Sequence, residues 1–390
     1  MTPPAPSIPG NAEPLPDQRA KFDVDGAVAY FNTAALSPVL RGVRAAGEAA
    51  LAWRSKPWGI ATADWFSGGE TLRSQRAALL GAHPDEIAHI PATSYGLATV
   101  ARNLKAKPGD RVLVLAGEFP SNYYTWKRFA LRTGAELLVV EREPGQEWTE
   151  AIVAAIDERV VVASVPNVHW TNGALIDLTR VAAAVHEVGA AFVIDASQSV
   201  GVMPLDVRAL RPTAVVTVGY KWLLGPMGFG FLYIDPTLRD GEPLEENWIS
   251  RAGADDFTSL IDYQDVYMPG ARRFDVGQRP NFHLVPMAIA AMEQIQEWTV
   301  PRIGATLAKL TREIGERATE IGVTVLPAEQ RAPHIIGLEL PVPAARRVAT
   351  ALEAAKVYAS RRGSSLRIAP HLHNSPEDVD RLLSAVASAL

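Results

Sequence analysis

Six short apolar runs, rich in β-branched residues and separated by helix-like segments, constrain the fold of this chain most strongly. Runs with so little polar alternation are typical of strands buried on both faces of a mostly parallel sheet. The segments between them show helical spacing, as in LTRVAAAVHEVG (178–189), which ends in a glycine stop signal. Strand–helix alternation of this kind predicts an α/β sheet. The runs cover residues 111–116, 136–141, 160–165, 190–196, 214–219 and 228–234.

The pattern changes after about residue 240, where helical segments dominate. They cover residues 287–298 and 302–321, followed by a β-like stretch at 334–340 and an amphipathic helix at 376–390. We therefore expect three parts, in chain order. These are a proline-rich, extended N-terminal arm (1–25), a large domain (26–298) and a smaller α+β domain (299–390).

Composition excludes several classes of function. The net charge is −5 and there is no long basic run, which argues against nucleic acid or an anionic membrane as the main partner. No uninterrupted apolar stretch reaches about 18 residues, so we expect no membrane span and a cytoplasmic protein. The chain has no cysteine, which excludes disulfides, thiolate metal ligands and cysteine nucleophiles. We expect no metal site.

Three polar residues stand where ligands of an open α/β sheet bind, beyond the carboxyl ends of the strands. Asp195 closes AFVID, Gln198 follows three residues later, and Lys221 follows AVVTVGY. Pyridoxal 5′-phosphate (PLP) needs a lysine amine to condense with its aldehyde and an acid to keep its ring nitrogen protonated. A carboxylate about 4 Å from that nitrogen contributes roughly 4 kcal/mol at an effective dielectric near 20, or about three pKa units. Asp195 suits this role, and Gln198 suits a hydrogen bond to the ring's phenolic oxygen.

Each of these residues has an ordinary structural interpretation when taken alone. An aspartate at a strand end is most often a cap or a solvated turn residue, and a lysine beside an apolar run usually extends to water. The combination is more specific, because Lys221 precedes WLLGPMGFGFLYI, where a charge has little other reason to lie.

Three ordered segments resemble the class V aminotransferase family, a branch of the fold type I PLP enzymes that includes cysteine desulfurases, isopenicillin N epimerase and kynureninase. They are VIDASQSVGVMPLDV (193–207), VGYKWLLGPMGFGFLYI (218–234) and SLRIAPHLHNSPEDVDRLL (365–383). The resemblance implies a mostly parallel seven-stranded sheet in a large domain, a smaller α+β C-terminal domain and PLP held by Lys221 as a Schiff base. It also implies an amino-acid substrate and a homodimer with a shared active site.

The resemblance also implies further cofactor contacts. Thr93 and Ser94 stand where a helix begins, and amide groups there suit a phosphate, although an ordinary N-cap is the alternative. Phe119 takes the place of the ring-stacking histidine of many relatives. Tyr220 is positioned to donate its hydroxyl to the phosphate, whereas a valine at 218 replaces a phosphate-binding serine. In ARRFDVGQRPNF (271–282), Gln278 replaces the usual threonine that contacts the phosphate of the neighbouring subunit.

Arg367 is the candidate for the substrate α-carboxylate, because a guanidinium fork matches two carboxylate oxygens. Arg361 and Arg362 lie close by in sequence and are candidates for a second acidic group, but a solvated turn is the preferred interpretation for both. The resemblance places three more residues near the substrate, although a structural role is more common for a lone histidine. They are Asn32, His169 and Trp170.

The expected chemistry starts with displacement of Lys221 by the substrate amine, after which the freed lysine moves a proton at the α-carbon. Cysteine desulfuration needs a catalytic cysteine and is therefore excluded. We expect a transferase, a class V aminotransferase, with C–S lyase or epimerase activity as the alternative and kynureninase-type hydrolysis also open. A non-catalytic PLP-fold binding protein is an alternative of another class. A nucleotide-binding protein is disfavoured, because neither G-x-x-x-x-G-K-[ST] nor G-x-G-x-x-G is present.

Overall fold

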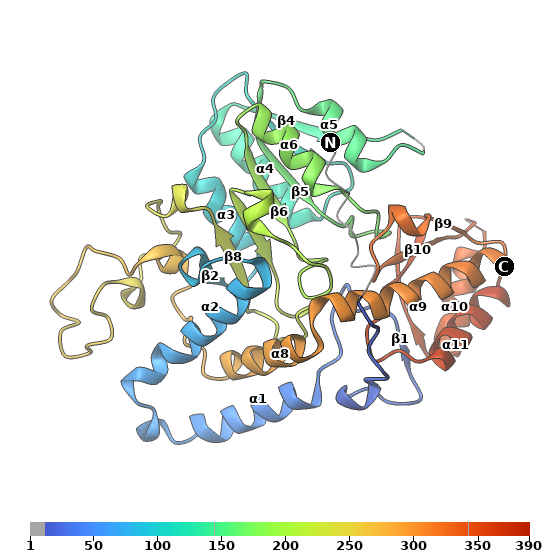
Figure 1. The fold of residues 1–390 in the computed structure, drawn as a ribbon, viewed down its shortest axis with the longest axis horizontal. Coiled ribbons are helices and arrows are strands. Elements are labelled where there is room, and N and C mark those ends of the chain that lie inside the picture. Colours follow the sequence, from blue (N-terminus) through green and yellow to red (C-terminus); the bar gives the residue numbers. More distant parts are fainter. Residues whose placement is uncertain (1–11, 144, 342) are drawn as a thin grey trace.

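The computed structural model describes residues 12–143, 145–341 and 343–390, so residues 1–11 of the expected N-terminal arm lie outside it. A seven-stranded mixed sheet forms the centre of the molecule (Figure 1), with strand order β2-β8-β7-β6-β5-β3-β4. Its strands are β2 (Ile87–Ile90), β3 (Arg111–Leu115), β4 (Glu136–Val140), β5 (Val160–Pro166), β6 (Ala191–Asp195), β7 (Ala214–Thr217) and β8 (Gly230–Ile234). All six predicted runs form strands, and the mostly parallel seven-stranded sheet is confirmed.

Parallel pairing connects β4, β3, β5, β6 and β7, whereas β8 runs antiparallel to both of its neighbours, β7 and β2. The carboxyl ends of four central strands (β3, β5, β6 and β7) therefore meet at one edge of the sheet. Helices fill the connections between strands, as expected for parallel pairs. They are α3 (Thr93–Asn103), α4 (Pro120–Thr133), α5 (Trp148–Ala155), α6 (Leu178–Glu187) and α7 (Val207–Leu210), while α1 (Arg41–Arg54) and α2 (Ser67–Leu80) precede the first strand of this sheet.

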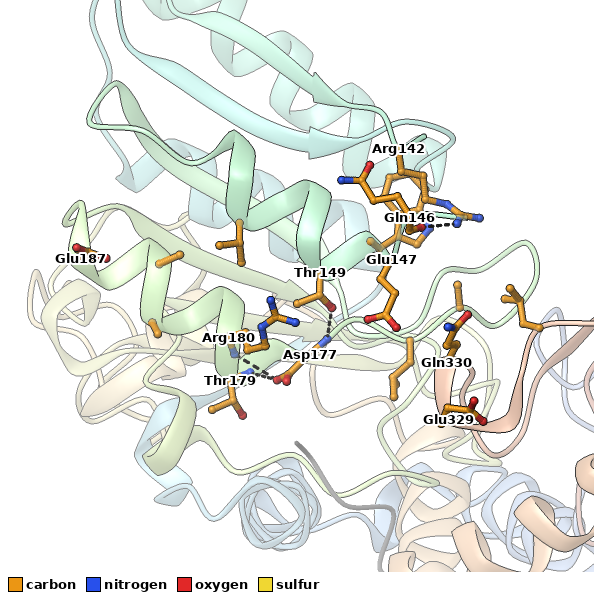
Figure 2. Close-up of a pocket in the computed structure, with 17 residues that line it drawn as sticks. Arg142, Gln146, Glu147, Thr149, Asp177, Thr179, Arg180, Glu187, Glu329 and Gln330 are labelled. Carbon is orange, nitrogen blue, oxygen red and sulfur yellow. Dashed lines mark hydrogen bonds between the residues drawn. The ribbon is translucent and has the colours of Figure 1, made fainter. Parts of the chain in front are cut away.

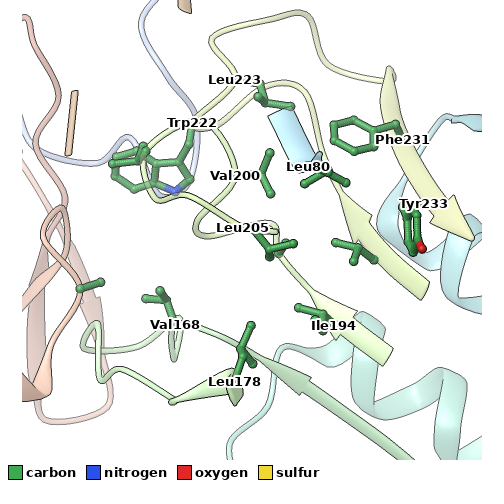
Figure 3. Packing of buried hydrophobic residues seen from close by; sticks show 14 of the residues in the cluster. Leu80, Val168, Leu178, Ile194, Val200, Leu205, Trp222, Leu223, Phe231 and Tyr233 are labelled. Atoms are coloured by element: carbon green, nitrogen blue, oxygen red, sulfur yellow. The ribbon is translucent and has the colours of Figure 1, made fainter. Parts of the chain in front are cut away.

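Both faces of the sheet are buried, which is why its strands read as continuous apolar runs. In β6, Phe192 and Ile194 face one apolar cluster and Val193 faces another. The first cluster, part of which is drawn in Figure 3, includes side chains of α1, α2, α6 and α8 (Leu284–Trp298), and the second includes side chains of α3 and α4. Alternate side chains of one strand thus contribute to two cores.

A smaller antiparallel sheet with order β12-β13-β10-β9 lies beside the large one. It consists of β9 (Thr324–Val325), β10 (Ile336–Glu339), β12 (Ser360–Arg362) and β13 (Ser365–Ile368), and it packs with α9 (Val300–Glu320), α10 (Ala345–Ala354) and α11 (Pro376–Ala387). A separate parallel pair joins β1 (Ala29–Tyr30) to β11 (Val357–Tyr358), and Ala29 and Phe31 enter the core of this part. We propose that the two domains divide at Thr299, which has a φ of 64° between α8 and α9, with β1 attached to the smaller domain.

The described part of the arm packs along the chain's C-terminal third. Phe22 is buried and stacks on Trp298 with 5.9 Å between ring centroids, and Arg19 Nη1 lies 2.6 Å from Asp378 Oδ2. Among the described residues, no helix combines the length and the apolar character that crossing a bilayer requires.

A buried ion cluster fixes the segment that carries Gln278. The carboxylate of Asp275 accepts bonds from Arg73 Nη2 (2.7 Å), from Arg279 Nη1 and from the backbone amide of His89 (2.7 Å). Burial alone raises the pKa of Asp275, but the two guanidinium groups hold it well below its usual range. All three charged side chains are almost fully buried, so each depends on the others for compensation.

We predict that Asp275→Asn lowers the free energy of unfolding by about 3–5 kcal/mol, because it leaves two buried guanidinium groups with only the partly exposed Glu70 as a counter-charge. Urea denaturation of the purified protein measures the change. The matched control is Asp240→Asn, which removes a carboxylate that is 98% exposed and paired with Arg273, and it should change stability by less than about 1 kcal/mol. Similar small changes for both variants would contradict the assignment.

Candidate functional site

A cavity of about 260 Å³ opens at the carboxyl ends of the central strands. It brings together most of the predicted site residues from separate elements: α3 begins at Thr93, β6 ends at Asp195, and Lys221 follows β7. The predicted residues that line it are Thr93, Ser94, Phe119, Trp170, Asp195, Gln198, Tyr220 and Lys221.

Lys221 lies in a closed turn between β7 and β8. The amide of Gly225 donates to the carbonyl of Gly219 (2.9 Å), and a Cβ at Gly219 would lie 2.3 Å from the carbonyl oxygen of Phe229. Only glycine fits there, which explains the glycine before Tyr220. The lysine is 6% exposed, and burial lowers the pKa of its amine to about 8. The amine is therefore much more available as a nucleophile or base than an exposed lysine.

Hydrogen bonds within the chain orient Asp195 and Gln198 and determine which of their donor and acceptor atoms remain free for a ligand. Asp195 is also 6% exposed, and its Oδ1 accepts from the amide of Ser197 (3.0 Å). Burial raises the pKa of this carboxyl, while the bonds from Ser197 and the charge of Lys221 act in the opposite direction. Gln198 Oε1 accepts from Trp222 Nε1 (2.9 Å) and its amide nitrogen donates to Ala34 O (3.1 Å). One amide hydrogen of Gln198 remains for a ligand.

Two aromatic rings form the wall of the cavity. The Lys221 amine lies 5.3 Å from the centroid of the Phe119 ring, and the Phe119 and Trp170 rings meet edge to face at 5.5 Å. Trp170 is fixed by a bond from Nε1 to the carbonyl of Gly117 (2.8 Å). This geometry places an aromatic face beside the amine.

Arg367 is connected to the site by hydrogen bonds to uncharged groups. Its Nη1 donates to the carbonyl of Trp170 (2.8 Å) and its Nη2 to Asn32 Oδ1 (3.2 Å), so the structure brings these three predicted residues together. The guanidinium is buried, which lowers its pKa to about 10, and the nearby charge of Arg362 acts in the same direction. It nevertheless stays a cation at neutral pH.

Four predicted residues are not among those that line the cavity. Asn32 and Arg367 are connected to it through Trp170, whereas His169 and Gln278 are not. The His169 ring stacks on Trp148 at 5.2 Å between centroids and contacts Thr171 through Nδ1, and burial lowers its pKa to about 4. It is not among the residues lining the cavity. Gln278 lines a different cavity, together with Pro57 and Trp65.

A larger cavity of about 800 Å³ lies between α5, α6 and the turn after β9 (Figure 2). It contains side chains of both charge signs, and some serve local structure: Asp177 caps α6 by accepting from the amides of Thr179 and Arg180. None of the predicted site residues lines it. Size alone therefore does not locate the site.

Glu118 is a second carboxyl in the cavity and was not predicted from the sequence. It is 8% exposed, and it accepts from the amide of Phe119 (2.6 Å) and from Asn122 Nδ2 (3.1 Å). Asn122 Oδ1 is occupied by Trp126 Nε1 (2.9 Å) and Ser164 Oγ (2.7 Å), which turns its amide nitrogen towards Glu118. Burial, aided by the charge of Asp195, raises the pKa of Glu118 to about 8. The feature of the sequence that could have indicated Glu118 is its position shortly after the buried strand β3.

This raised pKa predicts a pH-dependent stability. The folded protein holds a proton on Glu118 that the unfolded chain releases, so the contribution to stability is present below about pH 4.5 and is lost as the pH rises to about 8. In Glu118→Gln the free energy of unfolding of the apoprotein should fall less steeply across this range. Urea denaturation at several pH values measures the slope, and Glu316→Gln, at an exposed helical position, is the control. Equal slopes in all three proteins would refute the prediction.

The fold and the lysine-centred cavity define an α/β enzyme class whose ligand lies at the strand ends, and comparison with known proteins identifies the family. The sequence model described as Aminotransferase class-V matches residues 60–382, and the chain belongs to this family. A relative is the uncharacterized aminotransferase YcbU of Bacillus subtilis, 28% identical over 82% of this chain and 83% of that protein. Another is the kynureninase of Deinococcus radiodurans, 29% identical over 68% of this chain and 65% of that protein.

Solved structures share the fold. The apo cysteine desulfurase from Thermococcus onnurineus NA1 has a TM-score of 0.83 and 22% identity, covering 96% of this chain and 98% of that one. A C-DES mutant with glycine covalently linked to the PLP cofactor has a TM-score of 0.86 and 19% identity, covering 96% and 100%. Fold type I is thereby confirmed. Family membership together with such PLP-bound structures indicates PLP as the cofactor of this protein.

Proposed function

We propose that this protein transfers the amino group of an amino acid, with Lys221 as the covalent attachment point of PLP. The observation that carries the proposal is the burial of the Lys221 amine and the Asp195 carboxyl in one cavity with the Phe119 ring. These residues fit PLP, because they supply an amine for its aldehyde, an acid for its ring nitrogen and an aromatic face for its ring.

The other contacts with PLP and with the substrate are assigned to hydrogen-bonding groups that remain available in or beside the cavity. The remaining amide hydrogen of Gln198 suits the phenolic oxygen. Thr93 and Ser94 occupy the first turn of α3, where backbone amides and the helix dipole favour a phosphate dianion, and Tyr220 adds a hydroxyl. Arg367 holds the substrate carboxylate, with Asn32 and the Trp170 carbonyl fixing its orientation.

PLP supplies electron withdrawal, which acidifies the proton on the substrate α-carbon. Lys221, with its lowered pKa, takes that proton and returns it nearby on the same face. Among the described residues that line the cavity, the titratable groups are Glu118, Asp195, Tyr220 and Lys221. Neither histidine nor cysteine is among them. A single lysine base is sufficient for transamination, whereas a two-base inversion needs a second group on the opposite face.

C–S lyase activity is the second candidate. It is favoured by the likeness to C-DES, a cystine C–S lyase solved with its product cysteine persulfide, at a TM-score of 0.83 and 19% identity. Desulfuration through a protein persulfide is excluded, because the chain has no cysteine.

The test is product analysis of the purified protein with a panel of amino acids. We expect a yellow protein whose colour borohydride removes while fixing the cofactor to Lys221, and a stoichiometric α-keto acid released from the preferred substrate. Lys221→Ala should release no keto acid. Pyruvate with ammonia and a thiol or persulfide would favour the lyase, and a colourless protein that fails to take up PLP would overturn the proposal.

We further propose a homodimer in which the partner's Gln278 completes the phosphate site. Within one chain Gln278 lies apart from Lys221, beside Pro57 and Trp65. Large apolar side chains are exposed near Pro57 and on the loop that precedes Gln278 in the sequence, including Trp58 (84%), Ile261 (81%) and Tyr263 (93%). Apolar surface of this kind is typical of a protein–protein interface.

We predict that Gln278→Ala weakens PLP binding about tenfold or more, because a hydrogen bond to a charged group contributes roughly 1.5–3 kcal/mol. Fluorescence titration of the apoprotein with PLP measures the dissociation constant. Gln296→Ala, at an exposed position of α8, should leave it unchanged. A monomer in light scattering, or unchanged affinity in Gln278→Ala, would refute the shared site.

A further inference from the structure

Two arginines of the smaller sheet lie on the same face. Ser360 pairs with Arg367 and Arg362 pairs with Ser365 in the antiparallel hairpin of β12 and β13. Because residues two apart on a strand share a face, Arg362 and Arg367 are diagonal neighbours. Arg361 alternates to the other face and is exposed, with its Nε donating to the carbonyl of Gly363 (2.8 Å). The expected solvated turn therefore fits Arg361 but not Arg362.

Arg362 reaches the candidate site through the aromatic wall. Its guanidinium lies over the Trp170 ring, 5.4 Å from the centroid. Trp170 in turn contacts Phe119, whose ring lies 5.3 Å from the Lys221 amine. The charge of Arg362 acts on both Lys221 and Arg367, lowering the pKa of each in addition to the larger effect of burial. Arg362 thus belongs to the electrostatic environment of the cavity.

Neither arginine has a carboxylate partner among the described residues. Arg367 donates to a carbonyl and an amide oxygen, Arg362 Nη1 donates to the carbonyl of Arg361, and Nε of both is buried without a partner. The buried arginines Arg73 and Arg279 differ, because both pair with Asp275. Two guanidinium groups without a carboxylate partner, on one face and both in contact with Trp170 of the cavity wall, form a site for more than one negative charge.

We propose that Arg362 binds a carboxylate on the substrate side chain, so that the substrate is an acidic amino acid held by its α-carboxylate on Arg367 and its distal carboxylate on Arg362. The inference rests on the proposed function of Lys221 and Arg367. It adds a substrate class, an amino dicarboxylate, and a residue that selects it.

Binding of non-reacting dicarboxylates to the holoenzyme tests the inference without turnover. Succinate and glutarate should bind about 10- to 100-fold more tightly than butyrate and valerate, which have the same chain lengths and one charge fewer. Calorimetry at low ionic strength measures the affinities. Arg362→Gln should abolish this discrimination, Arg362→Lys should retain part of it, and Arg361→Gln should retain all of it.

Turnover gives a second readout. In Arg362→Gln, kcat/KM for aspartate and glutamate should fall about 10- to 100-fold, while that for asparagine, glutamine and alanine stays within about threefold. Equal affinity of the wild-type holoenzyme for mono- and dicarboxylates would overturn the inference. So would an equal loss for acidic and neutral substrates, because a purely structural contact of Arg362 with Trp170 predicts that result. Failure to bind PLP refutes the proposed function instead, so the two failures are distinguishable.

Discussion

The amine of Lys221 and the carboxyl of Asp195 share one buried cavity, and the parallel sheet holds them there. Burial disfavours both charged forms: it lowers the pKa of the lysine to about 8 and raises that of the aspartate. Burying these two charged groups is therefore electrostatically costly, and their mutual attraction offsets only part of the cost. A ligand with an aldehyde for the amine and a cationic ring nitrogen for the carboxyl removes both penalties. The same burial that destabilises the site alone makes it selective for such a ligand.

Most of the fold is readable from the sequence because its central strands are buried on both faces. The six apolar runs match β3 to β8 to within two residues at either end. The seventh strand, β2, escapes this reasoning because it has four residues and one of them is His89, a buried histidine that lies against Arg76 and the carbonyl of Gly69. Its polar partners lie 13 and 20 residues earlier in the chain, outside the local pattern of the strand. Only the family resemblance implied that strand.

The candidate site was predictable for residues that stand at strand ends. It was less predictable for residues whose role depends on the direction in which the side chain points. The positions of Asp195 and Lys221 could be inferred because Asp195 ends β6 and Lys221 comes shortly after β7. His169 is adjacent in sequence to Trp170, yet it turns towards Trp148 while Trp170 forms the cavity wall. Glu118 and Arg362 were missed or assigned to solvent for the same reason. Whether a charged side chain points into a cavity depends on tertiary contacts, and neither spacing nor composition encodes those contacts.

The large sheet and the C-terminal part of the chain are in contact beside the cavity, at the residue that follows the lysine. Trp222 packs edge-on against His334 at 4.3 Å and stacks on His371 at 5.9 Å, both from the C-terminal part of the chain, while its indole nitrogen holds Gln198. His334 also contacts the carbonyl of Gln198. Burial lowers the pKa of both histidines, so this contact carries no charge across the physiological range. A packed, uncharged joint cannot be adjusted by small shifts without opening voids. It therefore keeps the arginines of the smaller sheet at a fixed distance from Lys221 and Asp195, as the proposed selection of a substrate by the separation of its two charges requires.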